Sequence, residues 1–477
     1  MTIFLKISIL ICAVVACVSA NAQTTINADN SNLQYQGRIN FADVAAPIFV
    51  WPATSVKMKF TGTSVTLLMT DALADGGRYT TNYYDIILDN KIIKALAMNN
   101  TITLYSLANN LVDKEHVIEI FKRTEVGPST FNGFIITGTI LPLDPLATRK
   151  IEIVGASYET GYGNEKSYIN PNANPGYQSV NQDADSAYSA ILCRRFDAQS
   201  MCTSIAGTGM YRNYISATGT APDLYNELYP FNVSSNWDHS NYIPDLMIIS
   251  LGANDFGAET KNGIVLDSAS FVNTYISFIN TVKGFNPDIK ILMIYGGLYP
   301  GSNYLIRFRN YMLAINNHFA SAGNVYKFEL SPKFSPYGEE WHPTKANHVA
   351  FADQLTPVIQ NIMQWSVGST TYDCNGVLGG SATIDGCGIC TGGNTNFTSC
   401  LTAGILNSNT KPEINIYPNP TADFVYFDVE QKWKLFDGIG KTIRTGEGKE
   451  ISLKNLSNGM YLIKLENSSS LIRVIKV

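Results

Sequence analysis

Residues 151–163 read Ile-Glu-Ile-Val-Gly-Ala-Ser-Tyr-Glu-Thr-Gly-Tyr-Gly, and this stretch decides the fold of the central part of the chain. Its first five residues are a short apolar run that predicts a buried strand. Ser157 follows directly and is flanked by glycines. A serine just past the end of a strand is placed as an exposed nucleophile requires. By itself, however, the segment is more typical of a structural turn rich in Gly and Ser.

Apolar runs and segments of helical periodicity alternate downstream of this strand. We expect strands at 246–251, 289–295 and 324–330, and helices at 182–197, 271–282, 304–321 and 344–365, the last one kinked or divided near Pro357. Strands that alternate with helices predict an α/β domain with a parallel sheet over residues 148–365. In such folds the functional sites lie at the carboxyl ends of the strands.

The segments on either side of this domain are predicted to be β. Over residues 30–145 short alternating runs, such as Val56-Lys57-Met58-Lys59-Phe60, and a hairpin-like turn at Asp89-Asn90-Lys91 predict a β-sandwich of the jelly-roll type. Residues 366–411 are rich in Gly, Ser, Thr and Cys, which predicts a Cys-rich linker or a small stapled module. Residues 412–477 contain several short apolar runs that predict a small C-terminal β-sandwich.

The N-terminus and the charge indicate an exported protein. Residues 1–22 combine a positive charge, an apolar run and a small-x-small cleavage site, which predicts a secretory signal peptide. The alternative is a lipoprotein box at residues 14–17, which would place a lipid on Cys17. No other apolar stretch approaches ~20 residues, so we expect no transmembrane span in the mature chain. The net charge is −5 without a long basic run, which argues against nucleic acid as a partner.

The cysteines fall into two groups beyond the predicted signal peptide. Four lie in the linker, at positions 374, 387, 390 and 400, and secretion favours disulfides over zinc for this cluster. Their pairing stays open, because four cysteines allow three connectivities. Cys193 and Cys202 lie in the α/β region, where a disulfide and two buried free thiols are both consistent with the sequence.

Three further segments suit ester chemistry. Gly207 lies in a turn after a strand, where a glycine lets a backbone N–H approach a reacting centre. Asn254 follows the strand at 246–251, and its amide can donate to an oxyanion, although Asn-Asp is also ordinary turn chemistry. His342 precedes the last helix, with Glu339 and Glu340 just upstream. A neutral histidine there can accept the serine proton, oriented by a carboxylate or by a backbone carbonyl.

Taken in order, Ser157, Gly207, Asn254 and His342 all follow strands of one α/β domain. This ordered set resembles the SGNH (GDSL-like) hydrolase superfamily, which implies a three-layer α/β fold. The resemblance also implies that Ser157 is the nucleophile and His342 the base. The N–H groups of Ser157 and Gly207, together with the Asn254 side chain, would then form the oxyanion hole.

The chain resembles carbohydrate esterase family two more closely. A jelly-roll domain directly before the SGNH domain is one shared feature. The others are the local segments 161–163 (Gly-Tyr-Gly), 210–213 (Met-Tyr-Arg-Asn), 254–256 (Asn-Asp-Phe) and 341–343 (Trp-His-Pro). The resemblance implies hydrolysis of acetyl esters on plant cell-wall polysaccharides such as xylan and glucomannan, without a cofactor for catalysis. Trp341 is a candidate sugar platform, with a packing role as the alternative.

Two departures from the family pattern bear on this site. Ala156 stands where most relatives have Asp, so some backbone donors of the nucleophile turn must find other partners. The acid before His342 is Glu instead of the usual Asp. The acid–histidine spacing of the superfamily favours Glu339 as the acid that orients the histidine. The acid-Trp-His sequence of the family favours Glu340 instead. A backbone carbonyl can replace both.

The last quarter of the chain resembles two kinds of secreted module. The linker faintly resembles thrombospondin type 3 repeats, which implies a structural calcium ion on Asp373, Asn375 and Asp385 as the alternative to disulfides alone. Residues 412–477 resemble a type A sorting domain of the type IX secretion system, from Pro418-Asn419-Pro420 to Gly459-Met460-Tyr461. This implies the secretion machinery as a partner and export, to the medium or the cell surface, from a Bacteroidetes-type bacterium.

Two other function classes stay open from the sequence. One is a carbohydrate-binding surface protein whose SGNH domain has lost its activity, and the other is a surface adhesin or scaffold component. The joint presence of Ser157, Gly207, Asn254 and His342 favours an enzyme, a secreted esterase that acts on an acetylated polysaccharide.

Overall fold

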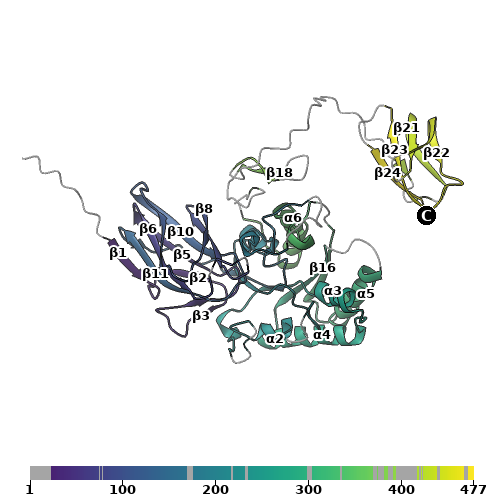
Figure 1. Ribbon diagram of the computed structural model, residues 1–477. Coiled ribbons are helices and arrows are strands. Elements are labelled where there is room, and N and C mark those ends of the chain that lie inside the picture. The colour runs from purple at the N-terminus through teal and green to yellow at the C-terminus, as the bar shows by residue number, and fades with distance from the viewer. Residues whose placement is uncertain are drawn as a thin grey trace, which may run out of the picture. The chain divides into compact units, whose positions relative to one another are not determined.

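The computed structural model describes residues 23–476 except 75, 78, 169–175, 216–218, 231, 233, 234, 298–302, 333–335, 369–372, 374–380, 385–389, 394–415, 418–420, 422, 438–440 and 467–470. The signal peptide and lipoprotein-box predictions, at residues 1–22, lie outside the described residues. The chain divides into two compact units, Met1–Leu401 and Thr402–Val477 (Figure 1).

The N-terminal part of the first unit consists of two antiparallel sheets around one apolar core. One sheet has the order β3-β4-β11-β6-β9 with β1 paired to β11, and the other has the order β12-β5-β10-β7-β8 with β2 paired to β5. The strands are β1 (Gln23–Asn27), β2 (Gln34–Gln36), β3 (Ile39–Asn40), β4 (Ile48–Phe49), β5 (Ser55–Gly62), β6 (Val65–Asp71), β7 (Tyr83–Leu88), β8 (Lys91–Ala97), β9 (Leu104–Ala108), β10 (Lys114–Lys122), β11 (Ser129–Thr137) and β12 (Ile140–Leu141).

Local sequence patterns account for these strands. Met58 and Phe60 on β5 are fully buried between half-exposed neighbours, as the alternation in the sequence predicts. Asp89 and Asn90 both have positive φ, which suits the tight turn of the β7–β8 hairpin. The first strand begins at Gln23, earlier than the expected start at residue 30. Only Ile26 of β1 is buried, so that strand has almost no apolar pattern.

A five-stranded parallel sheet of order β14-β13-β15-β16-β17 forms the α/β part of the same unit. Its strands are β13 (Arg149–Gly155), β14 (Ala198–Ser204), β15 (Leu246–Ile249), β16 (Lys290–Gly296) and β17 (Val325–Leu330). The chain leaves β13 first toward β14 on one side and later toward β15 on the other. Such a reversal of strand order opens a crevice at the carboxyl ends of the strands.

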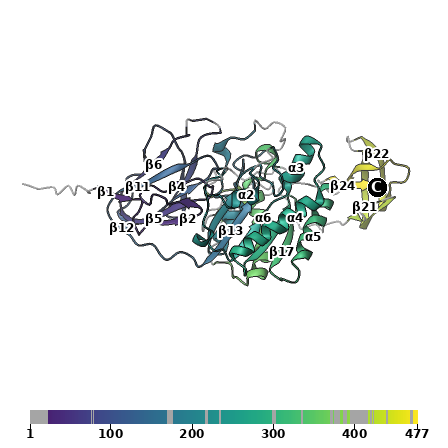
Figure 2. The ribbon, with the colours of Figure 1, turned by 90° about the horizontal axis from the view of Figure 1, so that it is seen from below.

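Helices cover both faces of this sheet (Figures 1 and 2). One face packs on α2 (Ala221–Tyr225), α3 (Ala253–Asn262), α4 (Ser268–Phe285) and α5 (Asn303–His318), and the other on α1 (Tyr188–Arg195) and α6 (Lys345–Met363). Short 3-10 turns lie at η2 (Ser179–Asn181), η3 (His239–Asn241) and η4 (Glu339–Trp341). No helix in the described part of the chain is both long and apolar enough to cross a membrane.

Two helices differ from the expectation. The predicted helix at 182–197 is only α1, because the carboxylate of Asp183 accepts the backbone N–H groups of Asp185 and Ser186 and holds that segment as a turn. Of the two predictions for Pro357, a kink or a division, the division is wrong, since α6 runs through this residue as one helix.

The structure describes only some of the residues on which the cysteine and calcium predictions rest. Cys193 and Cys202 are buried free thiols. Among the described linker residues, β18 (Thr383–Ile384) pairs with β19 (Cys390–Thr391). Positions 374, 387 and 400 lie outside the described residues, as do Asn375 and Asp385 of the calcium prediction. The Asp373 carboxylate accepts the backbone N–H of Ala382 at 2.9 Å.

The C-terminal unit is β, as expected, and its strands surround one apolar core. Pairing links all its described strands, which are β20 (Ile416–Tyr417), β21 (Phe424–Phe436), β22 (Thr442–Ser452), β23 (Gly459–Leu465) and β24 (Leu471–Lys476). The apolar runs around Tyr426 and Leu435 both lie in β21, which is a single long strand. Its register against β22 shifts between Tyr426 and Gln431, so one strand serves both ends of the sheet.

A buried ion pair joins the N-terminal sheets to the α/β part of the first unit. Arg38 donates to Glu152 of β13 at 3.3 Å, and both side chains are almost completely buried. The same guanidinium donates to the carbonyl oxygens of Tyr225 and Glu227 and lies over the ring of Trp237. Burial lowers the pKa of Arg38 and raises that of Glu152, so each charge depends on the other.

Replacing Arg38 by Met should destabilise the folded protein by about 3–5 kcal/mol, because Glu152 then stays buried without its cation. The midpoint of urea unfolding measures this change. Arg309→Met is the matched control, because Arg309 pairs with Glu329 at an exposed position and its loss should barely move the midpoint. Equal midpoints for the two variants would contradict the prediction.

Candidate active site

Ser157 lies two residues beyond the end of β13, in a tight turn at the carboxyl edge of the parallel sheet. Main-chain bonds hold this turn, from the N–H of Thr160 to the carbonyl of Ala156 at 3.3 Å and from the N–H of Tyr162 to the carbonyl of Ser157 at 3.1 Å. A cavity of about 920 Å³ opens above it. The cavity is lined by six of the seven residues singled out from the sequence, namely Ser157, Gly207, Asn254, Glu340, Trp341 and His342.

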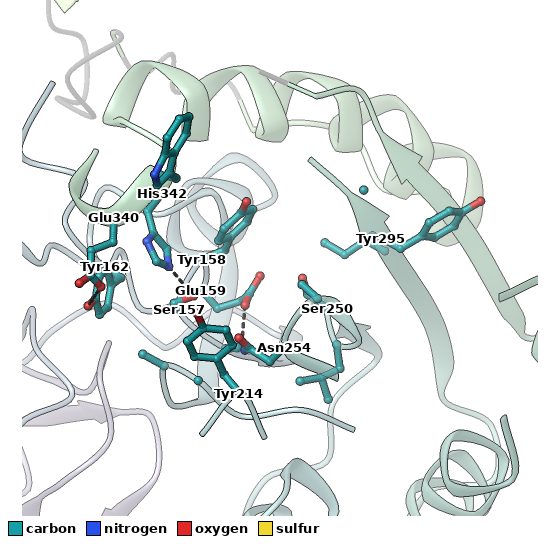
Figure 3. Close-up of a pocket in the computed structure, with 18 of the residues that line it drawn as sticks. Ser157, Tyr158, Glu159, Tyr162, Tyr214, Ser250, Asn254, Tyr295, Glu340 and His342 are labelled. Atoms are coloured by element: carbon teal, nitrogen blue, oxygen red, sulfur yellow. Dashed lines mark hydrogen bonds between the residues drawn. The ribbon is translucent and has the colours of Figure 1, made fainter. Parts of the chain in front are cut away.

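The hydroxyl of Ser157 and the ring of His342 are in direct contact. The distance from Ser157 Oγ to His342 Nε2 is 2.8 Å (Figure 3). The other ring nitrogen, Nδ1, lies 2.9 Å from the carbonyl oxygen of Glu339. A carbonyl oxygen can only accept a hydrogen bond, so Nδ1 carries the proton. The lone pair on Nε2 therefore faces the serine hydroxyl, as proton transfer from that hydroxyl requires.

Neither of the two candidate carboxylates contacts the histidine ring. The Glu339 carboxylate accepts the Asn181 side-chain amide at 2.5 Å and the backbone N–H of Gln178 at 2.9 Å. The Glu340 carboxylate accepts the hydroxyl of Tyr162 at 2.5 Å. Of the three partners that the sequence left open for His342, the structure brings the backbone carbonyl into contact with the ring.

The backbone before His342 is strained. Glu340 and Trp341 have φ values of 48° and 67°, in the left-handed region that residues other than glycine avoid. Each such residue costs of order 1–3 kcal/mol and persists only where its surroundings hold it. The buried Glu339 carboxylate anchors the start of this segment, and Gly338 N–H donates to the carbonyl of His342 at 2.7 Å across it. This left-handed conformation directs the Glu339 carbonyl toward the His342 ring.

Aromatic rings enclose His342. The Tyr162 ring lies 4.3 Å from the imidazole, centre to centre, and the Tyr158 ring lies 5.9 Å away. Burial lowers the pKa of His342, and the bond to the Glu339 carbonyl and the negative charge of Glu340 raise it in part. The net pKa lies below the ordinary value, so the neutral form of the base persists into mildly acidic solution.

Gly207 occupies the third position of a turn at residues 205–208. The N–H of Thr208 donates to the carbonyl of Ile205 at 3.3 Å, and Gly207 has φ of 83°. A positive φ at this position is typical of a type II turn and favours glycine. The Asn254 side-chain amide donates to the carbonyl of Thr208 at 2.8 Å, which ties the turn to the start of α3.

Two acidic residues organise the site without having been assigned a role from the sequence. Glu159 is buried, accepts the N–H of Ala156 at 2.7 Å and also accepts the hydroxyl of Tyr188. It therefore satisfies a donor of the nucleophile turn, where the sequence has Ala in place of Asp. The carboxylate of Asp255 accepts three successive backbone N–H groups at residues 210–212, and burial raises its pKa to about 6. In the sequence, the signal for a role of Asp255 is its position beside Asn254.

Comparisons with known proteins find similar chains. Residues 35–145 match the family described as carbohydrate esterase 2 N-terminal, and residues 415–476 match the secretion system C-terminal sorting domain. A cellulase/esterase, CelE of Acetivibrio thermocellus, is 30% identical over 356 residues, which cover 72% of this chain but only 41% of that protein. An acetylxylan esterase / glucomannan deacetylase of Cellvibrio japonicus is 29% identical over 356 residues, which cover 72% of this chain and 92% of that protein.

A solved structure is similar over the same region. It is a family two carbohydrate esterase from Clostridium thermocellum in complex with cellohexaose, with a TM-score of 0.64 and 28% identity. The similarity covers 70% of this chain and 99% of that one. The chain is therefore similar to family two carbohydrate esterases over about 70% of its length, its residues 35–145 match the carbohydrate esterase 2 N-terminal family, and its residues 415–476 match the secretion system C-terminal sorting domain.

Proposed function

We propose that the chain is a secreted serine esterase that removes O-acetyl groups from plant cell-wall polysaccharides such as xylan or glucomannan. The observation that carries this proposal is the hydrogen-bonded series from Ser157 Oγ through the His342 ring to the Glu339 carbonyl, at the wall of a large cavity. The relative named as an acetylxylan esterase / glucomannan deacetylase supports this class of substrate.

In this mechanism Ser157 Oγ attacks the acetyl carbonyl carbon while His342 Nε2 accepts the hydroxyl proton. The imidazolium that forms donates through Nδ1 to the Glu339 carbonyl, and the nearby charge of Glu340 stabilises it further. The bond between the acetyl carbon and the sugar oxygen then breaks, and His342 gives its proton to that oxygen, which leaves as a hydroxyl. Water, deprotonated by the same histidine, releases acetate from Ser157. The nucleophile, the base and the oxyanion donors all come from the chain, so these steps need no metal ion.

The negative charge on the tetrahedral intermediate requires donors opposite the histidine. We assign this role to the backbone N–H groups of Ser157 and Gly207 and to the amide of Asn254, which has a second hydrogen besides the one bonded to Thr208. A donor of this kind contributes about 2.7–4 kcal/mol to lowering the barrier.

The cavity suits a sugar as well as an acetyl group. Its volume lies within the range of pockets that enclose whole small molecules. Trp341 and Tyr214 line it and are about half exposed, so their rings are accessible for stacking on a sugar. We keep Trp341 as the candidate platform. We also assign the two-sheet N-terminal domain to the jelly-roll class as part of this proposal.

Replacing Ser157 by Ala should lower acetate release from acetylated xylan and glucomannan by roughly 10⁴-fold or more, and His342→Ala should have a similar effect, because the two groups act as a unit. Ser277→Ala is the control, since Ser277 is exposed on α4 away from the cavity.

Thermal unfolding should be unchanged in all three variants. Residual release within tenfold of the unmodified chain would contradict the role of Ser157. If the unmodified chain released no more acetate than Ser157→Ala, the alternative of a catalytically lapsed carbohydrate-binding protein would hold.

Glu339 and Glu340 should affect different parts of the pH profile. His342 must be neutral to accept a proton, so kcat/KM declines as the pH falls through the pKa of this residue. Glu340→Gln removes a charge that raises this pKa, so the decline should move to lower pH, and the plateau should fall only about two- to threefold because the same charge also stabilises the imidazolium. Glu339→Gln should leave the midpoint in place and lower the plateau about tenfold, because an amide cannot accept from Asn181 and Gln178 together.

The profile of kcat/KM against pH on acetylated glucomannan measures both effects. A shift of the midpoint in Glu339→Gln, or an unmoved midpoint in Glu340→Gln, would show that the assignment of the two residues is wrong.

The sorting domain indicates export by type IX secretion, to the cell surface or the medium of a Bacteroidetes-type bacterium. In that oxidising setting we expect the linker cysteines at 374, 387, 390 and 400 to form disulfides. The exported protein should lack the residues from about 412 onward or carry a surface anchor in their place. Mass spectrometry of culture-medium and cell-surface fractions measures this, and an intact C-terminus at Val477 on exported protein would contradict it.

A further inference from the structure

A short segment of the N-terminal domain reaches the turn at residues 205–208, which carries the candidate oxyanion donor of Gly207. It follows β10 directly and contains Glu125. One carboxylate oxygen of Glu125, Oε2, accepts the backbone N–H of Ala206 at 2.9 Å. The backbone N–H of Glu125 donates to Oε1 of Gln182 at 3.4 Å. The Glu125 carboxylate therefore ties the N-terminal domain to the Gly207 turn.

The position of Glu125 is itself held firmly. Lys122 is completely buried, and its ammonium group donates to the carbonyl oxygens of Thr124 and Val126, at 2.6 and 2.7 Å. These two residues flank Glu125 in the chain. The ammonium also donates to the side-chain oxygen of Asn82 on the N-terminal domain, at 2.7 Å. The segment is thus fixed on both sides of Glu125, and the carboxylate has a defined place from which to reach Ala206.

The bond to Ala206 matters because of where it lies in the turn at 205–208. The N–H of Thr208 is satisfied by the carbonyl of Ile205, and the N–H of Ala206 is satisfied by Glu125. The central peptide between Ala206 and Gly207 carries the N–H that we assign to the oxyanion. The bond from Glu125 holds the peptide that enters the turn, and so it fixes the place of the turn relative to the N-terminal domain. The N–H of Gly207 reaches the oxyanion only while the turn keeps this place.

We propose that Glu125, although it belongs to the N-terminal domain, is a positioning residue that holds the oxyanion donor of Gly207 in place for ester hydrolysis. It acts through the turn at residues 205–208 and does not line the cavity. The N-terminal domain is on this view a necessary part of the catalytic unit. The inference rests on the proposed esterase function, and it adds a requirement that Ser157 and His342 alone do not impose.

Two conservative variants of the full chain separate geometry from charge. Glu125→Gln keeps an acceptor oxygen at the same reach but loses the negative charge, whereas Glu125→Asp keeps the charge but shortens the reach by one methylene. We expect Glu125→Asp to lower kcat on acetylated glucomannan by about 10- to 100-fold with KM within twofold, and Glu125→Gln to stay within about threefold of the unmodified chain. Glu119→Asp on β10 is the matched control, because Glu119 pairs with Lys57 and Ser55 inside the N-terminal domain.

The same variants in a Gly207→Ala background test whether Glu125 acts through this turn. An alanine at a φ of 83° is strained although its Cβ would meet nothing within 4 Å, so Gly207→Ala disturbs the turn without a clash. In that background, Glu125→Asp should lower kcat by less than about threefold further, because the Gly207 N–H is already displaced.

Three outcomes would overturn the inference: an unchanged kcat in Glu125→Asp, a loss in Glu125→Gln as large as in Glu125→Asp, or losses that multiply in the Gly207→Ala background. Acetate release by the unmodified chain above Ser157→Ala, measured alongside, shows that the esterase function itself stands. Failure of the inference and failure of the proposed function are therefore distinguishable.

Discussion

The hydrogen bond between the His342 ring and the main-chain carbonyl of Glu339 sets the geometry on which the rest of the site depends. It fixes the tautomer of the ring without a buried charge next to it. A main-chain carbonyl cannot adopt a new rotamer as a carboxylate can, so its direction is set entirely by the local backbone. The left-handed conformations of Glu340 and Trp341 and the anchored side chain of Glu339 follow from that requirement. The backbone carbonyl of Glu339 thus bonds the His342 ring, and the side chain of Glu339 holds the backbone segment that carries this carbonyl.

A buried network of charges connects the same histidine to the N-terminal domain. Arg123, just after β10, pairs with Asp85 of β7 at 3.1 Å and with Glu165 at 2.5 Å. Lys345, the first residue of α6, pairs with Glu165 and with Asp183, both at 2.9 Å. The helix that begins three residues after His342 is therefore tied to the β-sheets by alternating charges. Because removal of one member leaves a buried partner uncompensated, the network favours one fixed arrangement of the two parts.

The sequence predicted those parts of the site that follow from local pattern. Ser157, Gly207 and Asn254 could be found because each follows a strand, and parallel strands bring their carboxyl ends to one edge. The partner of the His342 ring could not be chosen, since acidic side chains and a carbonyl lay at suitable distances along the chain. The contacts of Glu125 and Glu159 could not be predicted, because they join segments far apart in sequence or depend on the path of a turn. The same reason explains the missed strand β1, which is defined by its pairing with β11 and by a single buried side chain.

The two buried thiols of the α/β domain bear on which cysteines of the folded chain are open to oxidation. Burial raises the pKa of Cys193 to about 11 and that of Cys202 further still, so near neutral pH few of these side chains are in the reactive thiolate form. Six cysteines lie beyond residue 22, and six can pair in 15 ways, whereas four alone allow three. Once the central domain is folded, its two thiols are withdrawn from thiol exchange, and the number of pairings open to the remaining cysteines falls accordingly.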